Sequence, residues 1–142
     1  MAYINLDVNK VRRFCEDIFI KRGYTPQQSA DIVDVLLTAD LYGIESHGVQ
    51  RLIRYHLAIE EGSIIPDAKD EIVFQTPISA VIDAPKSMGQ VVSKKGMQMA
   101  IEMAKQHGVG MVCVRGSNHY GIAGYYTRSE ERRVGKECRS RW

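Results

Sequence analysis

The sequence GIESHGVQRLIRY places reactive side chains at the predicted start of a helix. Gly43 is suited to end one helix, and the Ser46 hydroxyl is suited to cap the next. Because residues four apart share a helix face, we expect His47, Arg51 and Tyr55 to form one polar stripe. An imidazole, a guanidinium and a phenol near the positive end of a helix suit a small carboxylate that also carries a proton-transferring oxygen. The same spacing also fits an exposed helix face whose polar groups are merely solvated.

A second set of reactive side chains follows the apolar run 109–114. Ser117 or Asn118 is suited to cap a helix through Ile122, which places His119 in its first turn. A positive helix end disfavours the imidazolium, so His119 is predicted to be neutral and able to accept a proton. Ligands of α/β proteins bind beyond the carboxyl ends of strands, where this loop lies. The alternative is that Asn118 and His119 only satisfy backbone hydrogen bonds of the loop.

Three helices are predicted to carry the first of these sets. One runs from Asp7, its cap, to about Arg22, and a second begins at the capping box 25–28, with proline at its first position. The third runs from His47 to near Gly62. The first seventy residues are therefore expected to be helical.

The pattern changes after residue 70. Short β-prone runs at 72–74 and 80–82 predict two strands, and a capping box at Ser87 with Gln90 predicts a helix that ends at Gly108. The apolar run that follows is typical of a strand covered on both faces. The order of strand, helix and strand indicates an α/β domain.

The last fifteen residues, RSEERRVGKECRSRW, have no apolar period and contain six Lys or Arg against three Glu. They also resemble the translation of a sequencing-adapter oligonucleotide, so we interpret them as a non-native tail on a truncated gene. The expected organisation is a helical segment at 1–70, the start of an α/β domain at 71–127 and a tail at 128–142.

Composition excludes several classes of function. The formal net charge is +2 for the whole chain and −1 without the expected tail, and no basic stripe predicts a nucleic-acid partner. No apolar run is long enough for a membrane span. Cys15 and Cys113 lie in apolar runs and are expected to be buried, reduced thiols, which favours the cytoplasm. We attribute Asp31, Asp34 and Asp40 to a solvated helix face and assign no metal.

The motifs GIESHGVQRL and VRGSNHYGIAGYY together resemble the type-2 malate/L-lactate dehydrogenase family. This family also contains ureidoglycolate and sulfolactate dehydrogenases and reductases of 2-oxo acids and cyclic imino acids. The resemblance covers residues 5–127, less than half of a full-length member. It implies an oxidoreductase that uses NAD or NADP to oxidise a small 2-hydroxy acid of the malate or L-lactate type. It also implies a fold distinct from the Rossmann fold, and the sequence has no G-x-G-x-x-G motif after a strand.

The same resemblance implies the roles of individual residues. Substrate-facing side chains would be those of Ser46, His47, Arg51 and Tyr55. His119 would be the proton acceptor, although some members assign that role to the histidine matching His47, so both histidines stay candidates. Most dinucleotide-binding residues are expected after residue 127, and the full-length form is expected to be a homodimer.

Two alternatives compete with the dehydrogenase. One is a 2-oxo acid or cyclic imino acid reductase of the same family, which differs in its substrate. The other is a non-catalytic helical interaction module, in which the stripe of His47, Arg51 and Tyr55 is a partner-binding surface. That module predicts that carboxylates do not bind and that His119 lies far from the stripe, whereas either enzyme predicts that His47, Arg51 and His119 converge on one cleft.

Overall fold

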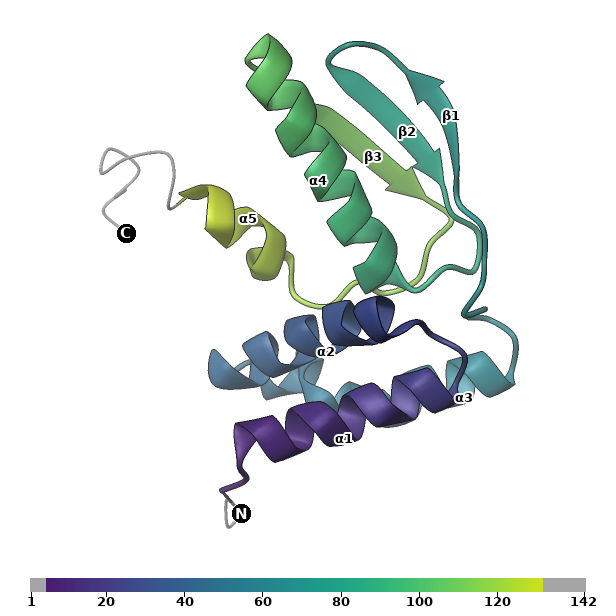
Figure 1. Cartoon of the computed structure of the whole chain (residues 1–142), viewed down its shortest axis with the longest axis vertical. Helices are drawn as coiled ribbons and strands as arrows, with labels where there is room; N and C mark the ends of the chain where they lie inside the picture. Colours follow the sequence, from purple (N-terminus) through teal and green to yellow (C-terminus); the bar gives the residue numbers. More distant parts are fainter. Residues whose placement is uncertain (1–4, 132–142) are drawn as a thin grey trace.

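The computed structural model describes residues 5–131 as a helical layer beside a small sheet with its own covering helix (Figure 1). The helical layer contains α1 (Val8–Lys21), α2 (Pro26–Leu41) and α3 (Leu52–Glu60). The second layer contains β1 (Glu71–Gln75), β2 (Ser79–Asp83), α4 (Gly89–His107) and β3 (Met111–Arg115), and α5 (Ala123–Glu131) follows. This is a helix-rich α/β arrangement, as expected from the sequence.

The first two helices begin where local chemistry predicts. Asp7 accepts a hydrogen bond from the Lys10 amide at 2.9 Å, and the side chains of Thr25 and Gln28 form the reciprocal capping box. Both helices bury apolar side chains against each other, with Phe19 at 1% exposure and Ile32 at 0%. Their packing forms the larger of two apolar cores.

The third helix begins later than expected. Two single 3₁₀ turns, Glu45–His47 and Val49–Arg51, precede α3, and Ser46 caps neither. Gly48 interrupts the helix with an extended backbone (φ −88°, ψ −152°). Asp40 causes this start, because its carboxylate accepts the Val49 amide at 2.8 Å and occupies the space that a side chain at position 48 would need. The predicted single polar stripe on one helix face is therefore wrong.

The sheet has the order β1-β2-β3. Strands β1 and β2 pair antiparallel, and β2 pairs with β3 in parallel through the α4 crossover. The predicted strands and the end of α4 at Gly108, with its left-handed φ of 84°, are confirmed. The predicted capping box at its start is not formed: Met88 is the N-cap residue without a side-chain bond, and the Gln90 amide points to another partner.

Strand β3 is covered on one face only. Val112 and Val114 pack with Ile82 under α4, whereas Met111 and Cys113 are exposed on the other face. The expectations of a strand covered on both faces and of a buried Cys113 are wrong for this reason. Cys15, in contrast, is fully buried.

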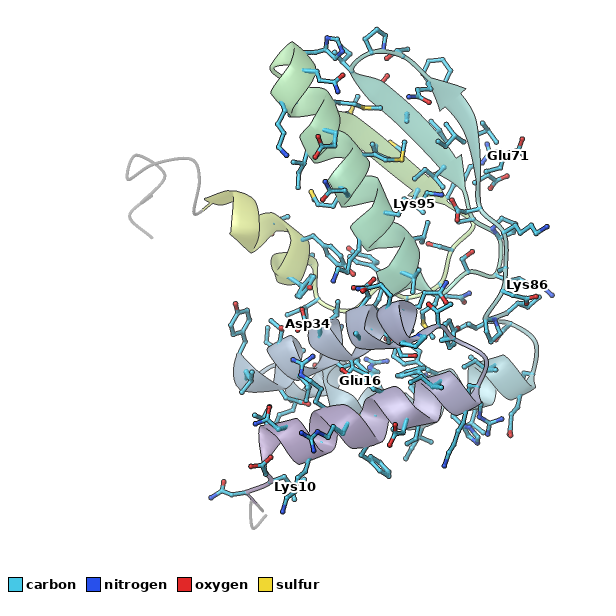
Figure 2. The ribbon with its side chains drawn as sticks, in the orientation of Figure 1. Lys10, Glu16, Asp34, Glu71, Lys86 and Lys95 are labelled. Atoms are coloured by element: carbon cyan, nitrogen blue, oxygen red, sulfur yellow. The ribbon has the colours of Figure 1, made fainter. Side chains whose placement is uncertain are left out.

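The acidic residues of α2 connect elements instead of forming a solvated face. Asp34 accepts a hydrogen bond from Arg12 on α1 at 3.1 Å and one from the Tyr125 hydroxyl at 2.6 Å, and Figure 2 labels it beside Glu16 of α1. Asp31 pairs with Lys94 of α4 at 2.6 Å. Together with Asp40, these side chains fix α2 against the elements on either side of it.

Helix α5 continues to Glu131, four residues past the expected tail boundary, and the remainder of the expected tail lies outside the described residues. No helix in the described part of the chain is long and apolar enough to cross a membrane.

The start of α4 touches the loop that carries His119. A Cβ atom at position 89 would lie 2.3 Å from the Asn118 carbonyl oxygen and 2.4 Å from that of His119. Only glycine therefore permits this approach between helix and loop.

We predict that Gly89→Ala displaces this loop and lowers the free energy of unfolding by about 1–3 kcal/mol, as overpacking does. Gly124→Ala is the matched control, because a Cβ there has no neighbour within 4 Å and alanine favours a helix. Chemical denaturation of both variants measures the difference. Equal stability of the two variants would contradict the close contact.

Candidate active site

The loop between β3 and α5 holds His119 at the junction of the two layers. Asn118 anchors it: its backbone amide donates to the Ser87 carbonyl at 3.2 Å, and its side-chain amide donates to the carbonyls of Ser63 at 3.0 Å and Ser87 at 3.2 Å. No helix begins at Ser117 or Asn118, so His119 lies in the loop and not in a first helical turn. Asn118 does satisfy backbone groups, but that role positions its neighbour.

Tyr55 connects His119 to the helical layer. Its hydroxyl lies 2.8 Å from His119 Nδ1 and accepts a hydrogen bond from Gln90 Nε2 at 2.7 Å. Tyr55 is 4% exposed and Gln90 is 0% exposed, so the bond between them is buried, whereas the contact with the exposed His119 is only partly buried. His119 is thus held through Nδ1, which leaves Nε2 for a ligand.

His47 and Arg51 lie on the same side of the junction. The His47 and His119 ring centroids are 5.3 Å apart, and the Ser46 hydroxyl lies 2.9 Å from His47 Nδ1. Arg51 donates from Nε to the Ser46 carbonyl at 2.6 Å. Among residues 5–131, neither terminal nitrogen of Arg51 has a hydrogen-bond or ion-pair partner. A partly buried guanidinium fixed in this way is ready to bind an anion.

The environment lowers the pKa of His119 below its usual 6.5. The largest cause is loss of hydration where the ring packs into the junction, followed by repulsion from the Arg51 cation, from His47 and from Arg54. A lowered pKa favours the neutral imidazole that the sequence predicts, but its cause differs from the predicted one. No helix end is involved, because α5 begins at Ala123.

A groove of about 940 Å³ opens beside His119, between α4, β3 and the start of α5. Small or apolar residues form much of its lining, including Gly96, Ala100 and Val112. His119 lines it together with Asn118, whereas His47, Arg51 and Tyr55 do not. The imidazole therefore borders both the basic cluster and a mainly apolar groove.

Comparison with known proteins agrees with this arrangement. The profile of the family described as malate/L-lactate dehydrogenase matches residues 6–132. The chain belongs to this family.

Individual relatives of the malate/L-lactate dehydrogenase family are similar at the level of sequence and structure. The chain is 45% identical over 136 residues to a malate dehydrogenase of Pyrococcus abyssi, which covers 94% of this chain and 37% of that protein. It is 46% identical over 109 residues to an L-sulfolactate dehydrogenase of Methanocaldococcus jannaschii, covering 76% and 32%. The structure of malate dehydrogenase from Pyrococcus horikoshii OT3 superposes with a TM-score of 0.88 at 40% identity, covering 91% and 38%. The chain thus spans between 32% and 38% of the length of these relatives.

The structure brings together the side chains that the sequence singled out, but the backbone that positions them differs from the single helix that the sequence predicted. His47, Arg51 and Tyr55 reach His119 across a broken helix start, and Tyr55 is buried, not part of a solvated stripe. Sequence reasoning missed Gln90 as a partner of Tyr55. Gln90 is 35 residues away from Tyr55, and the only local pattern that contains it predicted a capping box that does not form.

We predict that His119 titrates below pH 6.5 and that Arg51→Gln raises its pKa, because the substitution removes a nearby positive charge. The lowered pKa means that protonation of His119 is less favourable in the folded protein than in the unfolded chain, so its contribution to stability is complete above pH 6.5 and decreases as the pH falls towards its folded pKa. Proton NMR titration of the histidine rings measures the shift. Arg13→Gln, at an exposed position on α1, is the control, and an equal shift in both variants would refute the local effect.

Proposed function

We propose that this chain carries the substrate-binding and proton-transfer half of an NAD- or NADP-dependent oxidoreductase that oxidises a small 2-hydroxy acid of the malate or L-lactate type. The observation that carries the proposal is Arg51, which is fixed through Nε and has no acidic partner among the described residues, next to two imidazoles. A guanidinium whose terminal nitrogens have no partner among the described residues can bind an anion through both of them. A substrate carboxylate supplies that anion.

The proposal gives each side chain a task that its position supports. The terminal nitrogens of Arg51 bind the carboxylate in a bidentate fork, which fixes the orientation of the neighbouring hydroxyl carbon. His119 Nε2 accepts the hydroxyl proton, because the lowered pKa keeps the ring neutral. His47 and the Ser46 hydroxyl beside it stabilise the substrate oxygens. Tyr55 binds the His119 ring and holds it in place.

The groove beside His119 fits one part of a nicotinamide cofactor. Its lining of glycine, alanine and valine leaves room for a flat ring, and Ser93 and Ser117 add hydroxyl groups. No Lys or Arg is among these residues, so the groove offers no cation for a diphosphate. Its bound nicotinamide would supply the acceptor for the hydride of the hydroxyl carbon. We propose that the part of the relatives that this chain does not span supplies most of the remaining contacts, in a homodimeric, cytoplasmic enzyme.

A reductase is the second candidate. The chain is 34% identical over 109 residues to a 2,3-diketo-L-gulonate reductase of Escherichia coli. The same Arg51 and His119 would serve a 2-oxo acid, with His119 donating the proton. An interaction module without catalysis predicts His119 remote from Tyr55, which the 2.8 Å contact contradicts.

Arg51→Lys tests the carboxylate contact. Lysine keeps the charge but loses the planar fork, so the affinity for L-malate or L-sulfolactate should fall about tenfold or more. NMR titration of the chain with each acid measures the dissociation constant, and Arg13→Lys is the control. Unchanged binding in Arg51→Lys would exclude the bidentate contact.

His119→Ala and His47→Ala separate the two candidate bases. For turnover, residues 5–127 replace the matching segment of the Pyrococcus horikoshii malate dehydrogenase, because the chain spans 38% of that protein. If His119 is the base, His119→Ala should lower kcat for oxidation by about 10² or more and remove the acidic limb of the pH profile. His47→Ala should mainly raise KM. Exchanged phenotypes would assign the base to His47.

A further inference from the structure

Gln90 lies at the buried end of a hydrogen-bonded relay, Gln90–Tyr55–His119, that the proposed reaction does not yet use. Its side-chain nitrogen donates to the Tyr55 hydroxyl at 2.7 Å, and that hydroxyl meets His119 Nδ1 at 2.8 Å. Gln90 is 0% exposed, and its Oε1 has no hydrogen-bond partner in the described part of the chain. The nitrogen of this side-chain amide is hydrogen-bonded to Tyr55, and its oxygen is unpaired within residues 5–131. The amide can therefore rotate by 180° about its last bond, which exchanges the two atoms, without breaking any other hydrogen bond.

The orientation of this amide decides the direction of both hydrogen bonds that connect Gln90, Tyr55 and His119. When Gln90 Nε2 donates to Tyr55, the phenol proton is free to point to His119 Nδ1, so the neutral ring carries its proton on Nε2. When Oε1 faces Tyr55, the phenol donates to Gln90 and its oxygen accepts a proton from Nδ1. His119 Nε2 then presents a lone pair.

Only the second arrangement allows His119 to act as a base. Nδ1 faces Tyr55, so the ring can reach a substrate only through Nε2. After Nε2 takes the hydroxyl proton, both ring nitrogens carry protons, and Nδ1–H needs the phenol oxygen as acceptor. That oxygen is available only while the phenol proton is directed at Gln90 Oε1.

We propose that Gln90 is a positioning residue that selects the tautomer of His119 through Tyr55, and that the base-competent enzyme has Gln90 Oε1 facing the phenol. This inference rests on the proposed function for its catalytic meaning, but the tautomer itself is a property of this chain. The Gly121 amide donates to His119 Nδ1 at 3.4 Å and therefore favours the tautomer whose proton is on Nε2, which cannot act as a base. Gln90 and Gly121 therefore compete for the same ring nitrogen.

Two substitutions at position 90 should shift the tautomer of His119 in opposite directions. Gln90→Met keeps a long side chain but cannot accept the phenol proton, so Tyr55 donates to Nδ1 and the Nε2–H tautomer should predominate. Gln90→Glu supplies only acceptor atoms when ionised, so the Nδ1–H tautomer should predominate. Gln90→Leu repeats the first test with another shape if the methionine variant does not fold.

Nitrogen-15 NMR of histidine-labelled chain reads the tautomer directly, with Tyr55→Phe as the control that breaks the relay. In the Tyr55→Phe background, changes at position 90 should no longer alter the tautomer of His119. In the chimera with the Pyrococcus horikoshii enzyme, Gln90→Met should lower kcat for oxidation about tenfold or more with a smaller change in KM. The kcat of Gln90→Glu should lie between that of Gln90→Met and that of the unsubstituted chimera.

The outcomes separate this inference from the proposed function. The same His119 tautomer in wild type, Gln90→Met and Gln90→Glu would overturn the relay and leave carboxylate binding at Arg51 untouched. Absence of carboxylate binding together with an exchanged tautomer would overturn the proposed function and leave the relay standing. An exchanged tautomer with unchanged kcat in the chimera would overturn the catalytic role assigned to Gln90.

Discussion

The candidate site depends on the close contact between the start of α4 and the loop that follows β3. Without a side chain at position 89, the carbonyls of Asn118 and His119 approach the helix directly. This contact brings His119 within reach of Tyr55, which belongs to the other layer of the protein. It also places Gln90, one residue further along α4, on the far side of the same phenol. One steric condition therefore positions three polar side chains from three segments.

The parts of the fold that sequence reasoning predicted correctly are set by neighbours in the chain. Asp7 and Thr25 cap helices through groups three residues away, and Gly108 ends α4 with a conformation that glycine adopts freely. The start of α3 was predicted wrongly because it is decided by Asp40, whose carboxylate holds the Val49 amide from a different helix. No local pattern around Ser46 contains that information.

In the candidate site, too, local sequence predicted some features correctly, and tertiary contacts decided the others. The residue types of His47, Arg51, Tyr55 and His119 indicated the chemistry, but their spacing indicated a stripe that does not exist. Convergence required the sheet, the α4 crossover and the loop to place position 119 beside position 55. Gln90 had an alternative local explanation as part of a capping box, and only its tertiary partner assigns it to the site.

Arg51 and His119 are also coupled through charge. The cation of Arg51 contributes to the lowered pKa of His119, which keeps the ring neutral while the site holds no anion. A carboxylate bound to Arg51 offsets that repulsion, so the affinity of the ring for a proton rises when the substrate arrives. Under the proposed function, the same arginine that orients the substrate therefore strengthens the base only when there is a hydroxyl proton to accept. This coupling needs no conformational change, because it acts through a charge that the fold has already placed beside the ring.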